Sequence, residues 1–123
     1  MPKINIKSLL KTKEEETFFE TKGIFEENRI KYKEKDCFVK IDFQKEEIKM
    51  ERKKEDSFLV LNFSLTKETD GIYQIHDLAN FSLNIKTKEL LIQNQKIHVR
   101  YLLYLQEVFL GEFDFQIEFE VLS

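Results

Sequence analysis

The chain has 123 residues, of which 41% are hydrophobic, and a formal net charge of −3, so one globular domain spanning 1–123 is predicted and a disordered chain is excluded. Residues 1–60 carry 15 Lys and Arg against 14 Asp and Glu, and residues 61–123 carry 5 against 9. Nucleic-acid binders gather positive charge in one place, so this linear count predicts no nucleic-acid partner.

The residue types favour β-strands over helices. There are 12 Phe, whereas Ala79 is the only alanine. Alanine suits helices because it loses no side-chain entropy, and aromatic and β-branched residues fit the pleated surface of a sheet. We therefore expect an all-β protein with little helix.

Alternation of apolar and polar residues begins at the N-terminus and recurs along the chain. It predicts strands of period two at the following places: Ile4 to Ser8, Phe19 to Phe25, Ile30 to Tyr32, Cys37 to Phe43 and Ile48 to Arg52, then Phe58 to Phe63, Ile72 to His76, Phe81 to Ile85, Leu90 to Ile92 and Ile97 to Leu105. Asp70-Gly71 is expected to form a turn, and Gly23 a bend inside its strand.

The clearest strand lies near the C-terminus. Phe113, Phe115, Ile117, Phe119 and Val121 fall on one face, and the residues between them are carboxylates or glutamine. Counting this one, about eleven strand-like runs follow one another with short polar connectors. So long a meander must close or split, and Lys3 and Lys7 of the first run could pair with the acidic last run. We expect a closed antiparallel meander β-barrel.

Three segments carry a resemblance to a known family. They are Val99 to Leu105 followed by Gly111-Glu112-Phe113, then Phe19 to Gly23 followed by Ile30 to Glu34, and finally Phe81 to Leu90. In order and spacing they resemble the YwiB-like family of small uncharacterised bacterial proteins with a calycin (lipocalin-like) barrel. The resemblance implies that fold and a bacterial cytosolic setting, and it implies no established activity.

A barrel interior is one candidate site. Arg52 follows the apolar row of Ile48 and Met50. Tyr32, Tyr73 and Tyr101 also fall in apolar rows. An inward guanidinium with phenols nearby could hold the carboxylate of a small, partly apolar ligand. The alternatives are a strand-end arginine with its charge in water and tyrosines that belong to the core.

An outer apolar face is the second candidate. Phe58 and Val60 oppose other apolar residues of their strand, and so do Leu102 and Tyr104. The surplus face must be covered by a loop or terminal segment of the chain itself or by another subunit. This predicts either self-coverage or an interface such as a homodimer. Val108-Phe109-Leu110 is expected to form a further apolar loop that folds over a barrel mouth.

Catalysis has little support in the sequence. The two histidines, His76 and His98, and the single cysteine, Cys37, cannot build a zinc site or an activated nucleophile, so we expect no metal, no cofactor and no enzyme. No apolar run is long enough to span a membrane and the N-terminus lacks a signal-peptide core, which predicts a cytoplasmic protein with no membrane partner. The leading hypothesis is a barrel that binds a small ligand in its interior. The alternative is a non-catalytic structural or interaction protein with a filled barrel that acts through its outer apolar face, as a homodimer or with a protein partner.

Overall fold

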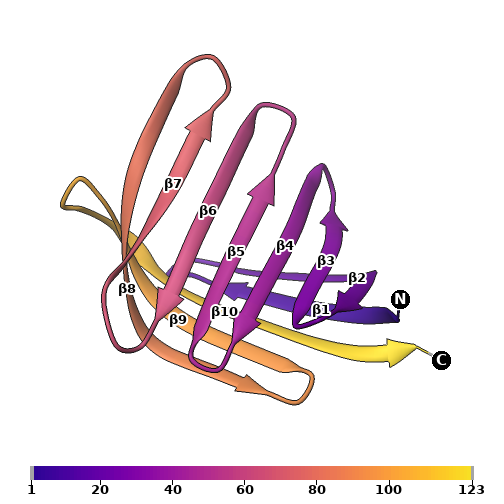
Figure 1. The fold of residues 1–123 in the computed structure, drawn as a ribbon. Coiled ribbons are helices and arrows are strands. Elements are labelled where there is room, and N and C mark those ends of the chain that lie inside the picture. Colours follow the sequence, from indigo (N-terminus) through magenta and orange to yellow (C-terminus); the bar gives the residue numbers. More distant parts are fainter. Residues whose placement is uncertain (1, 123) are drawn as a thin grey trace.

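The computed structural model describes residues 2–122, which form ten β-strands and no helix (Figure 1). The strands are β1 (Lys3–Lys11), β2 (Glu16–Glu26), β3 (Arg29–Glu34), β4 (Cys37–Gln44), β5 (Glu47–Lys53), β6 (Ser57–Ser64), β7 (Thr69–Ile75), β8 (Ala79–Gln93), β9 (Lys96–Leu105) and β10 (Val108–Leu122). Within these residues no helix has the length and hydropathy of a membrane span.

The ten strands close into one antiparallel barrel. Each strand pairs with its neighbours in sequence, and β1 closes the ring by pairing with β10. In Figure 1 strands β3 to β7 form a front layer that crosses a back layer containing β1 and β8 to β10. The predicted fold class, a closed meander barrel, is confirmed. The strand count is ten because the runs predicted at Phe81 and Leu90 merge into the long strand β8.

The alternation predicted for β10 is confirmed. Phe115, Ile117 and Phe119 are buried, Gln116 between them is half-buried and Glu118 is exposed, whereas Val121 at the end of the predicted row is 47% exposed. At the closing seam Lys7 lies opposite Glu118, as expected from their charges, but Lys3 lies opposite Leu122. Val108 to Leu110 does not form a loop: these residues begin β10 and their side chains are exposed.

Two glycines allow close contact between neighbouring strands. A Cβ on Gly23 would lie 2.4 Å from the carbonyl oxygen of Lys31. A Cβ on Gly71 would lie 2.6 Å from the carbonyl oxygen of Val60. Gly23 is also the residue at which β2 first pairs with β3. The turn predicted at Asp70-Gly71 is wrong, because both residues lie inside β7 and the connection from β6 occupies residues 65–68.

The middle of the barrel is filled by buried apolar side chains from eight strands, and Phe25 of β2 packs against them in a half-buried position. The buried apolar residues are Ile4, Ile6, Ile30, Tyr32, Cys37, Val39, Ile41, Ile48, Met50, Leu61, Phe63, Leu83, Ile85, Ile97, Val99, Tyr101, Phe115, Ile117 and Phe119. Aromatic rings pack inside this cluster, with 4.7 Å between the ring centroids of Phe63 and Tyr101. Burial of this much apolar surface is the main stabilising term of the fold.

Candidate functional site: the barrel interior and an outer basic groove

Arg52 lies on the inward row of β5, where its register partners are Val39 on β4 and Leu59 on β6. Its side chain is half-buried and forms an ion pair with Glu34, with 3.3 Å between Nη2 and Oε2. Arg52 therefore belongs to the inward row of β5, and its guanidinium donates a hydrogen bond to a carboxylate of the chain itself.

Tyr32 and Tyr101 are both buried in the core. Burial raises the pKa of each phenol, and the nearby charge of Arg52 partly offsets that rise in both. Glu34 raises the pKa of Tyr32 further. The hydroxyl of Tyr32 is buried and has no hydrogen-bond partner among residues 2–122. Arg52 and these two tyrosines thus gather in one part of the interior.

Tyr73 is the most exposed of the four residues predicted to bind a ligand in the interior. It pairs with Leu59, which in turn pairs with Arg52, so it belongs to the same lateral row of the barrel. Its side chain is 36% exposed and stacks on Phe81 with 6.3 Å between ring centroids. Tyr73 therefore lies at the edge of the interior and not beside the buried phenols.

The four predicted interface residues fall on two separate parts of the outer surface. Phe58 and Val60 lie on the outer face of β6, and Leu102 and Tyr104 lie on the outer face of β9. Strands β7 and β8 separate these two patches in the sheet order. All four side chains are half-buried, and Tyr104 packs on Phe109 of β10.

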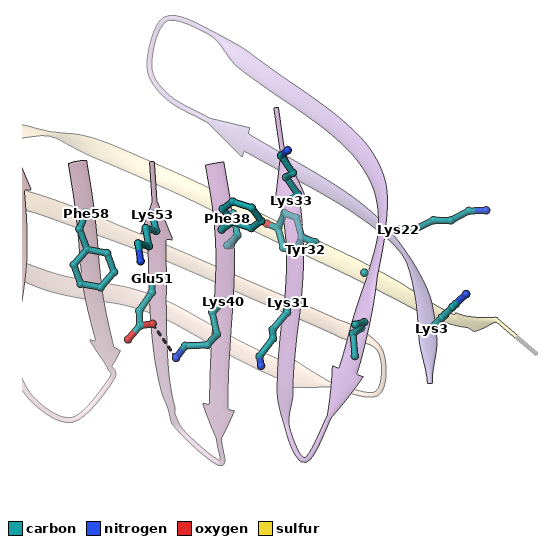
Figure 2. Close-up of a pocket in the computed structure, with 13 residues that line it drawn as sticks. Lys3, Lys22, Lys31, Tyr32, Lys33, Phe38, Lys40, Glu51, Lys53 and Phe58 are labelled. Atoms are coloured by element: carbon teal, nitrogen blue, oxygen red, sulfur yellow. Dashed lines mark ion pairs between the residues drawn. The ribbon is translucent and has the colours of Figure 1, made fainter. Parts of the chain in front are cut away.

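The patch on β6 borders a groove of about 810 Å³ that crosses the outer face from β2 to β6 (Figure 2). The residues that line it are Lys3, Lys22, Gly23, Ile24, Lys31, Tyr32, Lys33, Phe38, Val39, Lys40, Glu51, Lys53 and Phe58. Six of them are lysines and one is an acidic residue. This concentration of positive charge occurs in a chain whose formal net charge is −3.

Most of the groove lysines have no carboxylate beside them. Lys40 pairs with Glu51, with 3.0 Å between Nζ and Oε2, and Figure 2 marks this pair. Within residues 2–122, Lys22, Lys31, Lys33 and Lys53 have no carboxylate oxygen within 4.0 Å. Lys31 also lies directly opposite Lys40 across the β3–β4 pair, which places two like charges face to face. Among residues 2–122 the groove therefore gathers more positive than negative charge, which favours an anionic ligand.

Cations and aromatic rings alternate along one lateral row of the groove. Lys33 lies opposite Phe38, Phe38 opposite Lys53, and Lys53 opposite Phe58. The Lys33 ammonium lies 5.4 Å from the centroid of the Phe38 ring, and the Phe38 side chain is 61% exposed. Lysine stems and rings provide an apolar floor while the ammonium groups remain in water. The row can bind a ligand that is both anionic and flat or apolar.

Sequence reasoning found the interior residues but missed the groove. The lysines of the groove come from β1 to β5 and are spread over 51 residues of the chain, from Lys3 to Lys53. Acidic residues between them, such as Glu20 and Glu34, cancel them in a linear count. The one usable signal in the sequence was Phe38, a large apolar residue that shares the outward row of its strand with Lys40. In the part of the chain that the structure describes, no three His, Cys, Asp or Glu side chains are placed to hold a metal ion.

Comparison with known proteins places the chain in a family. No curated protein sequence matches it. The crystal structure of the YwiB protein from Bacillus subtilis aligns over 99% of this chain and 92% of its own, with 14% sequence identity and a TM-score of 0.49. Residues 4–117 match the family described as a domain of unknown function, DUF1934. Because this match spans most of the chain, the chain belongs to the DUF1934 family, a family of unknown function as the predicted resemblance implied.

Proposed function

We propose that the protein is a non-catalytic binding module that takes an anionic partner on the outer groove formed by β2 to β6. The observation that carries this proposal is a set of lysines that have no carboxylate partner within residues 2–122 and lie beside an exposed aromatic ring. Such a surface is unfavourable for the free protein, because like charges repel and an apolar ring is left in water. An anionic partner with apolar or flat groups would relieve both costs.

The interior gives less support for the leading hypothesis drawn from the sequence. A carboxylate ligand would have to displace Glu34 from Arg52, and the middle of the barrel is filled by packed side chains. This favours the alternative in which a filled barrel acts through its outer surface. The cytoplasmic location predicted from the sequence stays part of this proposal, and the single free Cys37 is compatible with it.

The proposal can be tested with a simple polyanion. Isothermal titration calorimetry with inorganic polyphosphate should show binding that weakens as NaCl rises from 50 to 200 mM. The triple variant Lys22→Glu/Lys31→Glu/Lys33→Glu should lose this binding, because it replaces three positive charges in the groove with negative ones.

A matched control changes the net charge equally at other places. Lys13, Lys67 and Lys88 are exposed and lie outside the groove. The variant Lys13→Glu/Lys67→Glu/Lys88→Glu should retain most of the affinity. If the wild-type protein does not bind polyphosphate, or if both triple variants weaken binding equally, the groove is not the binding site and the proposal is wrong.

A small ligand in the interior is the second candidate, favoured by the buried Tyr32 hydroxyl, which has no hydrogen-bond partner in the described part of the chain. A ligand atom beside this hydroxyl would accept the hydrogen bond that the free protein lacks. Native mass spectrometry of protein purified without denaturant should then reveal a stoichiometric small molecule that is lost in Arg52→Ala and Tyr32→Phe. A native mass equal to the chain mass in the wild-type protein would reject this candidate.

A further inference from the structure

We infer that the partner of the outer groove is single-stranded nucleic acid, held by phosphate contacts to lysines and by stacking of bases on Phe38 and Phe58. This inference rests on the proposed function, because it names the anionic partner of the same groove. It differs from the expectation drawn from the linear charge count, which could not register charges that only the fold brings together.

The first argument is the order of groups along the lateral row. From β3 to β6 the row reads Lys33, Phe38, Lys53, Phe58, and each residue lies directly opposite the next. Adjacent strands are about 4.8 Å apart, so the two phenylalanine positions are about 10 Å apart with a cation between them. A nucleotide strand likewise alternates charged phosphates with flat bases, and single-strand binding proteins combine basic grooves with aromatic stacking surfaces.

The second argument is the continuation of the row past β6. Phe58 lies opposite Gln74 on β7, and Gln74 lies opposite Asn80 on β8. These residues line a smaller hollow of about 250 Å³ that shares Lys53 and Phe58 with the groove. Amide side chains can both donate to and accept from the edges of unpaired bases. The surface thus offers partners for phosphates, base faces and base edges along one track.

The two phenylalanine rings distinguish between classes of anionic partner. An acidic peptide can pair with the lysines but has no regular flat groups for the two rings. A duplex can contact the lysines through its phosphates, but its bases are already stacked on one another and cannot stack on Phe38. The exposed rings therefore favour a single strand over both.

The direct test is fluorescence anisotropy with a labelled single-stranded RNA of twelve nucleotides and mixed sequence. Phe38→Ala should weaken binding about 10- to 100-fold, the range measured when one base-stacking aromatic is removed. Phe38→Leu should weaken it similarly, because a leucine keeps the apolar contact but offers no flat face. Phe58→Ala should also weaken it, by less, because Phe58 is more buried than Phe38.

Phe18 is the matched control for Phe38. Its side chain is 62% exposed, against 61% for Phe38, but it lies on β2 outside the groove. Phe18→Ala should leave RNA affinity unchanged. A loss equal to that of Phe38→Ala would overturn the inference, because it would mean that any exposed ring contributes.

An abasic strand of the same length separates this inference from the proposed function. It should bind more weakly than RNA, and Phe38→Ala should not weaken it further. If polyphosphate and the abasic strand bind as tightly as RNA, and Phe38→Ala changes nothing, the groove binds anions but the inference is overturned. If neither polyphosphate nor RNA binds, both the inference and the proposed function fail.

Competition with other polyanions completes the test. Poly-glutamate, duplex RNA of the same sequence and vesicles containing phosphatidylserine should each compete poorly with the single strand at equal charge. Tighter binding of any of them would overturn the inference in favour of an acidic peptide, a duplex or a membrane surface. For a single strand the logarithm of affinity should fall with the logarithm of salt concentration, with a slope of about −0.7 per phosphate contacted. Three to five lysine contacts would therefore give a slope of about −2 to −3.5.

Discussion

Two parts of the outer surface differ in whether their charged side chains form ion pairs. On the wall formed by β8, β9 and β10, Arg100 pairs with Glu89 at 2.9 Å and with Glu112 at 3.7 Å, and His98 contacts Asp114 at 2.7 Å. On the groove wall, Lys31 faces Lys40 and several lysines have no carboxylate partner in residues 2–122. The first arrangement holds adjacent strands together. The second opposes folding slightly and so indicates a use outside the chain itself.

The interior contrasts with the groove in a similar way. Phe63 is 1% exposed and packs on Tyr101 in the core, whereas Phe38 is 61% exposed. A phenylalanine therefore stabilises the fold in the core, whereas in the groove it remains exposed to water. This difference can be measured, because only the buried ring contributes its full transfer and packing free energy to folding.

The largest predicted effect concerns these two rings. Phe63→Ala should lower the free energy of unfolding by about 3–5 kcal/mol, because it leaves a cavity in the core. Phe38→Ala should change it by about 0.5 kcal/mol or less, as expected for an exposed side chain. Urea denaturation followed by circular dichroism measures both. A large loss in Phe38→Ala would make Phe38 a structural residue and weaken the case for a functional groove.

The next effect concerns alkaline pH and sharpens the description of the interior. Burial raises the pKa of Tyr32 and Tyr101, so the folded protein keeps both protons after the unfolded chain has begun to lose them near pH 10. The stabilisation is fully present below pH 10 and is lost as pH rises toward the folded pKa values. In that window the free energy of unfolding should fall by about 1.4 kcal/mol per pH unit for each phenol.

Urea denaturation at a series of pH values between 8 and 11.5 tests this expectation. Tyr32→Phe should remove about half of the additional slope, because one buried phenol remains. An unchanged slope in Tyr32→Phe would show that other groups, such as the many lysines, cause the alkaline loss.

Gly23 joins the two regions, because it lies in β2 at the edge of the groove and beside the core residue Ile6. Gly23→Ala should destabilise the fold by about 1–3 kcal/mol, because the added Cβ would lie 2.4 Å from the Lys31 carbonyl oxygen and β2 and β3 would have to separate. The same substitution should weaken anion binding by displacing Lys22 from Lys31. Hydrogen exchange should localise the change to β2 and β3, and exchange that increases uniformly would contradict this account.

Much of the fold could be predicted because local pattern decides it. Each strand buries one face, so the spacing of residues such as Phe115 and Ile117 is enough to predict β10. A long meander also has few ways to avoid unpaired edge strands, and closure into a barrel is one of them. Local sequence was not enough to predict the conformation of Asp70-Gly71. Gly71 is required by contact with Val60 on a neighbouring strand and not by the backbone angles of a turn.

The residues of the candidate site also differ in how far local pattern could predict them. Arg52 could be placed inside the barrel because row membership follows from spacing along one strand. Its pairing with Glu34 and the missing partner of the Tyr32 hydroxyl depend on the register between strands. The groove was the hardest part to predict from the sequence, because its row of Lys33, Phe38, Lys53 and Phe58 forms only when four strands are aligned. The register between paired strands cannot be determined from a single sequence.

A smaller effect tests the buried hydroxyl. Tyr32→Phe should raise the free energy of unfolding at pH 7 by about 1 kcal/mol, because it removes a buried donor that has no hydrogen-bond partner within residues 2–122. Thermal denaturation compared with wild type measures this. A clear loss of stability would show that the hydroxyl is satisfied in solution, for instance by an ordered water, and would weaken the argument for a ligand in the interior.

The smallest effect bears most directly on the contrast between the two outer walls. Lys31→Glu should raise stability by about 0.2–1 kcal/mol, because it replaces a like-charge pair with Lys40 by an opposite-charge pair. Arg100→Gln on the β9 wall should lower it by a similar amount, because Arg100 loses its contacts with Glu89 and Glu112. Denaturation at low salt resolves both, and high salt should reduce both. If Lys31→Glu is more stable than wild type and yet binds polyphosphate more weakly, the unpaired lysines cost stability in return for binding; if it is less stable, the two walls do not differ as their contacts indicate.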